Sequence, residues 1–219
     1  MQILVVSATE LEIKPSIPFF TKNKIDVLIT GIGGVATAYS LNNYYNKNKP
    51  GVIIQAGIGG YFTENDLGEV FVIKEEIFAD LGVWENKQFK TIFDLKLENK
   101  NKFPFKKGML INSNKKLLGL TPCKKVRGVS VNEITTDKKK ISWYKQNFSP
   151  VVESMEGAAF HYVCLQQKIP FIQLRAISNY VGERNKSKWK MKEAITNLNE
   201  ELTFLLTALS NYNETDFRI

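Results

Sequence analysis

The chemistry open to this chain is limited by how few nucleophilic and metal-binding side chains it has. His161 is its one histidine, and Cys123 and Cys164 have neither the paired spacing of a zinc site nor that of a disulfide framework. Every multi-histidine metal site is excluded, and so is a Ser-His-Asp triad in its usual form unless His161 is itself the base. The setting of His161 between Phe160 and Tyr162 is more typical of a structural histidine. Catalysis would therefore rest on carboxylates, amides, backbone groups or arginine, without a metal.

Four polar residues occur where apolar segments begin or end. Glu12 follows the first aliphatic run, and Glu156 starts an apolar helical segment. Arg175 lies within a later aliphatic run, which Asn179 follows. Burying an arginine without a partner is costly, and we expect Glu12 to be the partner of Arg175. A glutamate in the first turn of a helix is favoured by the helix dipole alone, so Glu156 by itself would be structural.

Two glycine-rich turns also follow aliphatic runs. The segment 31–36, Gly-Ile-Gly-Gly-Val-Ala, fits the dinucleotide fingerprint G-x-G-x-x-A. That fingerprint needs an acidic residue about 20 positions further on, where the next run of this chain ends in Gln55. We therefore expect no nicotinamide cofactor. The segment 57–60 is the second turn, and because ligands bind outside the carboxyl ends of parallel strands, both turns and Glu12 are predicted to line one pocket.

The alternation of aliphatic runs, glycine turns and helical segments predicts a largely parallel sheet covered by helices. We expect strands at 3–6, 26–30, 52–55, 69–73, 126–131, 151–153 and 170–178, a helix that starts at 10–13, and helices at 35–45, 136–146, 155–167 and 191–209. The last of these is amphipathic, because its apolar residues recur every three or four positions. The lysine-rich stretch 84–107 is interpreted as an excursion or flap. No linker or repeat interrupts the chain, so residues 1–219 are predicted to form one domain.

Composition excludes several classes of protein. The chain has 219 residues, of which 43% are hydrophobic and 24% charged, so wholesale disorder is not expected. No apolar run approaches the roughly 20 residues of a spanning helix, and the first residues lack the features of a signal peptide. We expect a soluble, cytoplasmic protein without a membrane partner. The net charge of +8 comes from scattered lysines without a nucleic-acid-binding motif, so we expect a solvated surface and no nucleic acid.

Five segments of the chain resemble the nucleoside phosphorylase and nucleosidase superfamily, in the order in which that family has them. They are 7–12 (SATELE), 31–33 (GIG), 56–60 (AGIGG), 154–158 (SMEGA) and 175–179 (RAISN). The last two together are far more specific than either glycine turn. The resemblance implies a three-layer αβα sandwich with a central mixed, largely parallel sheet. It also implies a small-molecule nucleoside substrate, neither metal nor organic cofactor, and a homodimer or larger homo-oligomer.

The same resemblance implies a role for each matched residue. Glu12 would orient and deprotonate the attacking water, with Arg175 near that water and carboxylate. Met155 and Glu156 would contact the ribose, Glu156 by accepting hydrogen bonds from the 2′- and 3′-hydroxyls, and Asn179 would address the purine. Further substrate contacts are expected from two residues of the second glycine turn and one of a later loop: Ile58, Gly59 and Ile134.

Within the superfamily the chain is most similar to the futalosine hydrolases, through 66–70, 78–82 and 178–184. This implies cleavage of the purine N-glycosidic bond of futalosine, releasing hypoxanthine and dehypoxanthine futalosine on a route to menaquinone. Adenine-cleaving relatives typically have aspartate where this chain has Asn179. The NH₂ of an asparagine can reach N7 and a 6-oxo group together, which favours hypoxanthine.

Water rather than phosphate is the expected nucleophile, because neither glycine turn contains an arginine or lysine. Futalosine carries a benzoate on its 5′ side, and we expect one of Arg184, Lys186 or Lys188 to pair with that carboxylate. Three alternatives stay open. They are an adenine-releasing nucleosidase acting on methylthioadenosine/S-adenosylhomocysteine or aminodeoxyfutalosine, a purine nucleoside phosphorylase, and a non-enzymatic binder of anions or nucleic acid.

Overall fold

The structure, a computed structural model, describes residues 1–63, 67–86 and 88–217. Position 66, part of one of the segments noted above, lies outside the described residues. The described strands are β1 (Ile3–Ser7), β2 (Asp26–Ile29), β3 (Val52–Tyr61), β4 (Val70–Phe78), β5 (Gly82–Glu85), β6 (Gln88–Thr91), β7 (Leu110–Ile111), β8 (Lys125–Ser130), β9 (Val152–Ser154) and β10 (Phe171–Tyr180). The α-helices are α1 (Glu10–Ile13), α2 (Ile17–Asn23), α3 (Gly34–Asn48), α4 (Lys115–Leu118), α5 (Lys138–Phe148), α6 (Gly157–Gln166) and α7 (Met191–Leu209).

The main sheet is mixed and largely parallel, as predicted. Its order among the described strands is β10-β4-β8-β9-β3-β1-β2, with β7 beside β4. Strand β1 pairs in parallel with β2 and β3, and β8 pairs in parallel with β4 and β9. Strand β10 runs parallel to β3 but antiparallel to β4, and β9 is antiparallel to β3.

The sheet differs from a simple open layer because part of it closes on itself. Strand β10 pairs with both β4 and β3, so β3, β10, β4, β8 and β9 form a ring. Glycines at the carboxyl half of β3 allow the tight approach that this closure needs. A Cβ atom added at Gly59 would lie 2.8 Å from Val152 Cγ1 and 2.9 Å from the Glu153 carbonyl oxygen. Any larger residue at position 59 would separate β3 from β9.

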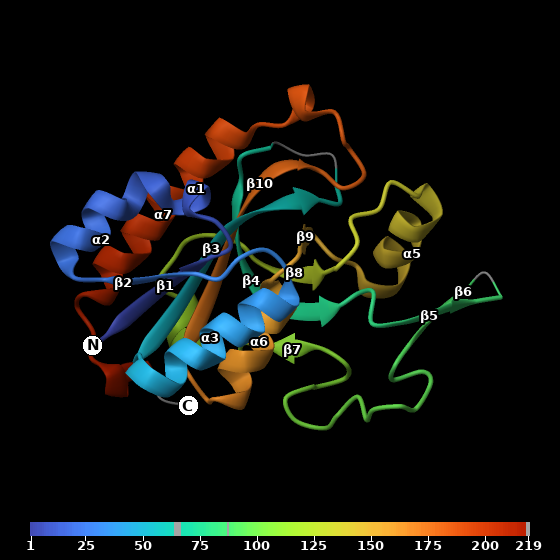
Figure 1. The fold of residues 1–219 in the computed structure, drawn as a ribbon, viewed down its shortest axis with the longest axis horizontal. Coiled ribbons are helices and arrows are strands. Elements are labelled where there is room, and N and C mark those ends of the chain that lie inside the picture. The colour runs from blue at the N-terminus through green and yellow to red at the C-terminus, as the bar shows by residue number, and fades with distance from the viewer. Residues whose placement is uncertain (64–66, 87, 218–219) are drawn as a thin grey trace.

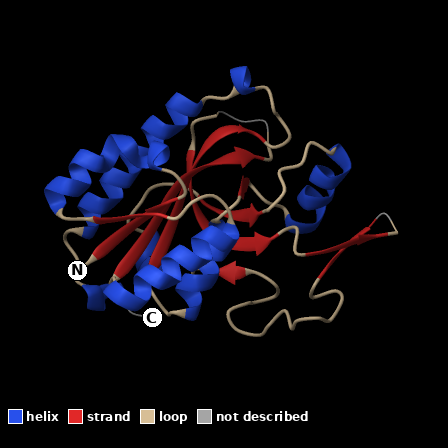
Figure 2. Ribbon diagram, in the orientation of Figure 1, coloured by secondary structure: helices blue, strands red, loops and turns tan. Residues whose placement is uncertain are grey.

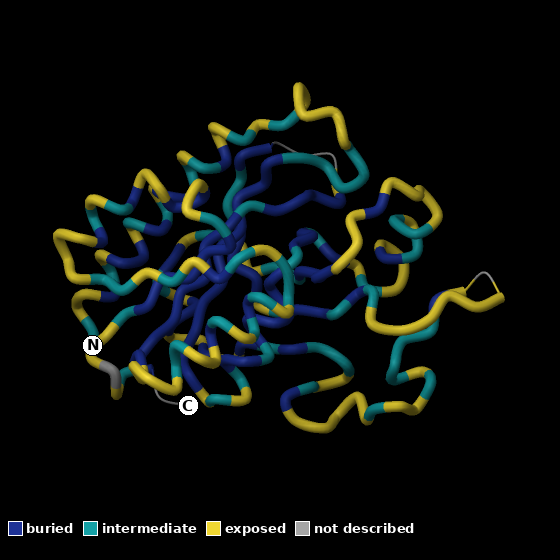
Figure 3. Tube along the Cα trace, in the orientation of Figure 1, coloured by how far each residue is buried: buried dark blue, intermediate teal, exposed yellow. Residues whose placement is uncertain are grey.

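Helices cover both faces of the sheet (Figures 1 and 2). Helix α7 packs on β3 and β10. Helix α6 packs on β4 and β8, and α3 packs against α6. Alternate residues of β1 point to opposite faces, as in any strand. Val5 belongs to the cluster that includes Leu198 and Leu202 of α7, whereas Leu4 belongs to the cluster that includes Phe160 of α6. Both faces are therefore buried, which explains the uninterrupted aliphatic run (Figure 3).

The segment predicted as an excursion begins with a hairpin. Strands β5 and β6 pair with one another outside the main sheet and extend away from the body of the molecule (Figure 1). Trp84 and Phe89 of this hairpin pack against Trp143 of α5, with ring centroids 6.0 and 5.1 Å from that of Trp143. The long amphipathic helix at 191–209 is found with the predicted bounds. Among the described residues, no helix combines the length and apolar character needed to cross a bilayer.

Candidate active site

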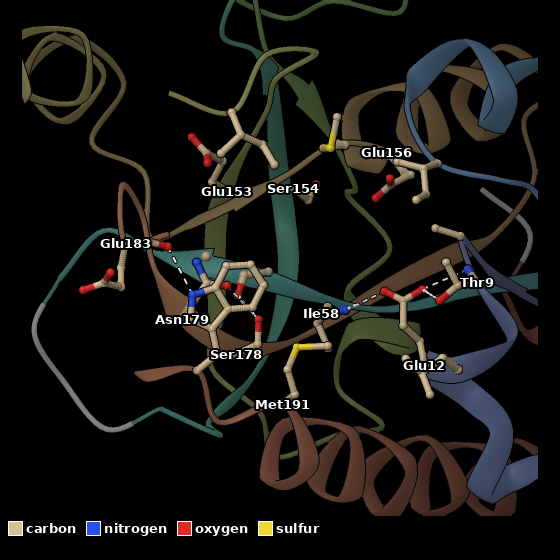
Figure 4. A pocket seen from close by; sticks show the side chains of 18 of the residues that line it. Thr9, Glu12, Ile58, Glu153, Ser154, Glu156, Ser178, Asn179, Glu183 and Met191 are labelled. Carbon is tan, nitrogen blue, oxygen red and sulfur yellow. Dashed lines mark hydrogen bonds between the residues drawn. The ribbon is translucent and has the colours of Figure 1, made fainter. Parts of the chain in front are cut away.

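A cavity of about 360 Å³ opens at the carboxyl ends of β3 and β10, beside the start of α6. Its size is within the range of ligand pockets. Seven of the eight residues predicted for the site line it: Glu12, Ile58, Gly59, Ile134, Met155, Glu156 and Asn179. Glu12 and Glu156 lie toward one end, and Asn179 lies at the other (Figure 4). The structure thus brings together segments that are up to 167 positions apart in the sequence.

Glu12 is fixed at the first turn of α1 by donors from three segments. Thr9 is the N-cap of this helix, and its N–H and Oγ1 both donate to Glu12 Oε2, at 2.9 and 2.8 Å. Ser7 Oγ donates to the same oxygen at 3.1 Å, and the N–H of Ile58 donates to Oε1 at 3.1 Å. The side chain is 6% exposed. These bonds hold one carboxylate in a single orientation at the wall of the cavity.

Glu156 forms the buried ion pair of the site. Arg175 Nη1 lies 3.2 Å from Glu156 Oε2, and the two side chains are 2% and 7% exposed. The N–H of Gly33, in the first glycine turn, donates to Glu156 Oε1 at 3.0 Å. The prediction that Glu12 would be the partner of Arg175 is therefore wrong. The reason is that Glu12 Oε1 already accepts from Ile58, while the start of α6 brings Glu156 to the guanidinium.

Arg175 lies beneath the cavity rather than in its lining. Its Nη1 also donates to the carbonyl oxygen of Ile58 at 3.2 Å. A Cβ atom added at Gly57 would lie 2.5 Å from Arg175 Nη1 and 3.1 Å from Glu12 Oε1. Only glycine at position 57 therefore leaves room for both the Arg175 guanidinium and the Glu12 carboxylate. The two groups do not form an ion pair with each other.

A second buried carboxyl, that of Glu76, is linked by hydrogen bonds to the start of α6. Glu76 of β4 accepts from Gln173 Nε2 at 3.0 Å and from Ser130 Oγ at 3.1 Å. Ser130 Oγ in turn accepts from the N–H of Ala158 at 2.7 Å, in the first turn of α6. Burial raises the pKa of Glu76 to about 7, against smaller opposing effects of its hydrogen bonds and of the Arg175 charge. Sequence reasoning missed Glu76, because it belongs to a charged stretch, Lys74 to Glu76, that is typical of a solvated part of a strand.

At the far end of the cavity, Asn179 is held by its neighbours. Ser178 Oγ donates to Asn179 Oδ1 at 2.8 Å, and Asn179 Nδ2 donates to the carbonyl oxygen of Tyr180 at 2.9 Å. An amide NH₂ has two N–H groups, so one remains for a ligand.

Glu153 also lines the cavity, although the sequence analysis did not single it out. Burial, and then the charge of Asp80, raise the pKa of Glu153 to about 7.

His161 lies outside the cavity and is fully buried in the molecule. Its ring packs edge-to-face on Phe171 with centroids 4.7 Å apart. Burial lowers the pKa of His161 to about 3, so the ring is neutral at ordinary pH. These observations fit the structural role expected for it. Within 1–63, 67–86 and 88–217, no group of three or more His, Cys, Asp or Glu side chains is arranged to hold a metal ion.

Comparison with known proteins places this geometry in a family. The family model described as "Phosphorylase superfamily" matches residues 12–211, which is most of the chain. The chain belongs to the phosphorylase superfamily. A futalosine hydrolase of Thermus thermophilus is 32% identical over 183 residues, covering 82% of this chain and 80% of that protein. A 5′-methylthioadenosine/S-adenosylhomocysteine nucleosidase of Psychromonas ingrahamii is 28% identical, covering 74% of this chain and 72% of that protein.

The fold of this superfamily member also matches solved structures. A 5′-methylthioadenosine/S-adenosylhomocysteine nucleosidase of Helicobacter pylori, solved with butyl-thio-DADMe-Immucillin-A, superposes with a TM-score of 0.78. The match covers 97% of this chain and 99% of that one at 17% identity, so it concerns the fold alone. The expectations of the family and of an enzyme are confirmed. Which nucleoside this superfamily enzyme cleaves is a separate question.

Proposed function

We propose that this enzyme hydrolyses the purine N-glycosidic bond of futalosine, releasing hypoxanthine and dehypoxanthine futalosine in menaquinone biosynthesis. The observation that carries the proposal is the cavity itself, which has the Glu12 carboxylate near one end and the Asn179 amide at the other. A nucleoside lying along it would have its ribose beside Glu156 and its purine beside Asn179. The similarity to the Thermus thermophilus futalosine hydrolase supports the choice of substrate.

Breaking a bond between purine and ribose places positive charge on the sugar and negative charge on the base. Glu12 acts as the general base that takes a proton from the attacking water, a role that contributes on the order of 10²–10⁴ in rate. Glu156 accepts hydrogen bonds from the 2′- and 3′-hydroxyls of the ribose, and its carboxylate is held in place by Arg175 and by the N–H of Gly33. Arg175 acts through Glu156 rather than on the substrate, because it does not line the cavity.

Asn179 supplies the donor for the leaving purine. One of its N–H groups is used by the Tyr180 carbonyl, and the other is left for N7 and the 6-oxo group. An adenine leaving group would bring its own N–H donors to this position and leave a buried donor unpaired, at a cost of about 1–3 kcal/mol. Asn179 therefore favours a 6-oxopurine over a 6-aminopurine.

Water is the proposed nucleophile. Arg184 is the one basic residue among the described residues that line the cavity, and it belongs to the loop after β10 rather than to a glycine turn. A phosphate anion beside Glu12 would be repelled by the Glu12 carboxylate, whose hydrogen-bond donors are all neutral groups. Among the described lining residues, no cation lies next to Glu12 to offset that repulsion. This arrangement favours hydrolysis over phosphorolysis.

Arg184 is the proposed partner of the benzoate carboxylate of futalosine. Of the three basic residues considered for this role, it is the one in the cavity lining. Its guanidinium lies 5.7 Å from the centroid of the Trp189 ring, which also lines the cavity. Lys188 instead pairs with Glu183 at 2.8 Å, and its side chain is 66% exposed.

A homodimer or larger homo-oligomer is proposed from an apolar patch at the mouth of the cavity. Leu11 and Ile32 line the cavity and are 59% and 65% exposed, and Val35 and Tyr39 on α3 are 83% and 74% exposed. Val35 and Tyr39 are four positions apart and share one helix face. Sedimentation of the wild type and of V35E tests this: a dimer that V35E dissociates supports it, and a monomeric wild type contradicts it.

The substrate proposal is tested by incubating the enzyme with futalosine in phosphate-free buffer and following hypoxanthine by chromatography. Methylthioadenosine, S-adenosylhomocysteine and aminodeoxyfutalosine are run in parallel. A second candidate, the adenine-releasing nucleosidase, is favoured by the similarity to the Psychromonas ingrahamii protein. Release of hypoxanthine at the highest kcat/KM supports our proposal. Preferential release of adenine supports the second candidate, and turnover only with added phosphate supports a phosphorylase.

A further inference from the structure

The end of the cavity at Asn179 also contains the carboxyl group of Glu153. Strand register places Asn179 of β10 beside Gly60 of β3, and Gly60 beside Glu153 of β9. Residues in register on neighbouring strands point to the same face of a sheet. All three line the cavity, so an amide and a carboxyl flank a strip of bare backbone at Gly60. Figure 4 shows Glu153 and Asn179 at the same end, away from Glu12.

The missing side chain at Gly60 leaves room for its neighbours. A Cβ atom added there would lie 3.1 Å from Val181 Cγ2 and 3.6 Å from Asn179 Nδ2. Glycine at position 60 therefore lets the Asn179 amide lie close to the backbone of β3, next to the strand that carries Glu153.

Glu153 is buried without a fixed partner. The residue is 7% exposed, and its Oε2 atom has no hydrogen-bond partner among the described residues. The charged groups near it have other contacts: Lys140 of α5 pairs with Glu133 at 3.3 Å, and Asp80 accepts from the N–H of Asn132. Buried polar atoms in native proteins are normally paired, and an exception calls for an explanation such as a ligand.

We propose that Glu153 determines base specificity, by accepting a hydrogen bond from the N1–H of a 6-oxopurine while Asn179 addresses the adjoining N7 and O6 edge. This inference rests on the proposed cleavage of a hypoxanthine nucleoside. In hypoxanthine the 6-oxo group lies between N7 and N1, so groups on either side of Gly60 meet neighbouring edges of one ring. Adenine has no hydrogen on N1, and above about pH 7, where the Glu153 carboxyl is ionised, the N1 lone pair of adenine would face a carboxylate. Glu153 and Asn179 thus select the same base through different atoms.

The test uses free bases, so that it does not depend on turnover. Affinities of the wild type, E153A and E153Q for hypoxanthine, 1-methylhypoxanthine and adenine are measured by calorimetry at about pH 8, above the pKa of about 7 to which burial raises Glu153. E133A is the control, because Glu133, like Glu153, acts on Tyr144 through its charge but is 74% exposed and lies outside the cavity lining. Thermal unfolding of each variant shows that it is folded.

We expect E153A to bind hypoxanthine about 5- to 150-fold more weakly than the wild type does, as for the loss of a buried hydrogen bond. Its affinity for 1-methylhypoxanthine, which lacks the N1–H, should not fall. E153Q keeps an acceptor oxygen and adds a donor, so it should retain hypoxanthine and bind adenine more tightly than the wild type. E133A should match the wild type for all three bases.

An equal loss of affinity for hypoxanthine and 1-methylhypoxanthine in E153A, or no loss for either, overturns the role of Glu153. If E153A does not fold, unchanged adenine affinity in E153Q overturns it. In all of these cases, a wild type that still releases hypoxanthine from futalosine leaves the proposed function standing. A wild type that neither binds hypoxanthine nor releases it overturns both.

Discussion

Arg175 pairs with Glu156, at 3.2 Å between Nη1 and Oε2, rather than with Glu12. The same Nη1 atom donates to the carbonyl oxygen of Ile58, while the N–H of Ile58 donates to Glu12. One residue of the second glycine turn is thus shared between the carboxylate proposed to activate water and the arginine that holds the ribose-binding carboxylate. Replacing Glu12 and replacing Arg175 should therefore have different effects on activity and stability.

Replacing Glu12 should remove general-base catalysis while leaving binding intact. E12Q is isosteric and keeps one acceptor oxygen, which can serve the Thr9 and Ser7 donors, while its NH₂ replaces the oxygen that accepts from Ile58. We expect kcat for futalosine to fall on the order of 10²–10⁴, with a much smaller change in KM. Steady-state kinetics measure this. E10Q is the control, because Glu10 lies on the same helix and is exposed. A kcat for E12Q within about threefold of the wild type would argue against Glu12 as the base.

Replacing Arg175 should disturb both the fold and the site, because it leaves Glu156 buried without its cation. Breaking a buried ion pair costs about 3–5 kcal/mol of folding stability. R175K keeps a charge but not the planar guanidinium, so we expect it to lose less folding stability than a variant without a cation would. R175K is therefore the variant used for kinetics. Its KM should rise as Glu156 loses its orientation. R127K is the control, since Arg127 pairs with Glu75 outside the cavity. Wild-type stability and KM in R175K would contradict the positioning role.

Replacing Asn179 by aspartate should shift the preference for the purine. An aspartic acid can donate to N7 and accept from an exocyclic amine, whereas the asparagine NH₂ can only donate. In N179D we expect the ratio of kcat/KM for aminodeoxyfutalosine over futalosine to rise about 5- to 150-fold. N185D is the control, because Asn185 lies on the following loop outside the cavity lining. An unchanged ratio in N179D would remove the basis for its role in selectivity.

The buried carboxyl of Glu76 predicts a pH-dependent stability. Burial raises its pKa to about 7 in the folded protein from an ordinary value of 4.5. The folded state therefore binds the proton more tightly than the unfolded state does, and stability is lost as the pH rises from about 4.5 through about 7. E76Q cannot ionise, so between about pH 5 and pH 8 it should gain on the order of 2–3 kcal/mol relative to the wild type.

Urea denaturation of the wild type and E76Q at the two pH values measures this difference. E75Q is the matched control, because Glu75 is the neighbouring residue on β4 and is partly exposed beside Arg127. The same difference in unfolding free energy between E76Q and the wild type at both pH values would show that Glu76 does not titrate in this range.

Residues whose signal is local in the sequence could be predicted. Glu12 lies in the short helix after β1, Asn179 lies near the end of β10, and Glu156 is the N-cap of α6, so the end or the start of an apolar run marks each of them. The structure brings all three to one cavity. The long closing helix could be predicted too, because its apolar spacing is a property of one segment.

Features that depend on pairing between distant segments could not be predicted. The partner of Arg175 depends on where α6 begins relative to β10, and Glu12 is the wrong choice because Ile58 already occupies its Oε1. The closure of the sheet depends on β10 pairing on both of its edges. Glu153 lies near Asn179 because of the register of β9, β3 and β10. In the sequence it is a single glutamate in a short apolar run, which does not indicate a site.

The central claim, that water held at Glu12 cleaves the bond to the purine addressed by Asn179, is tested most directly by following the oxygen. Futalosine is turned over in H₂¹⁸O with phosphate present, and the products are analysed by mass spectrometry. The account predicts one ¹⁸O atom on the sugar product, none in hypoxanthine, and no sugar phosphate. A sugar phosphate, or failure to release hypoxanthine at all, would contradict it.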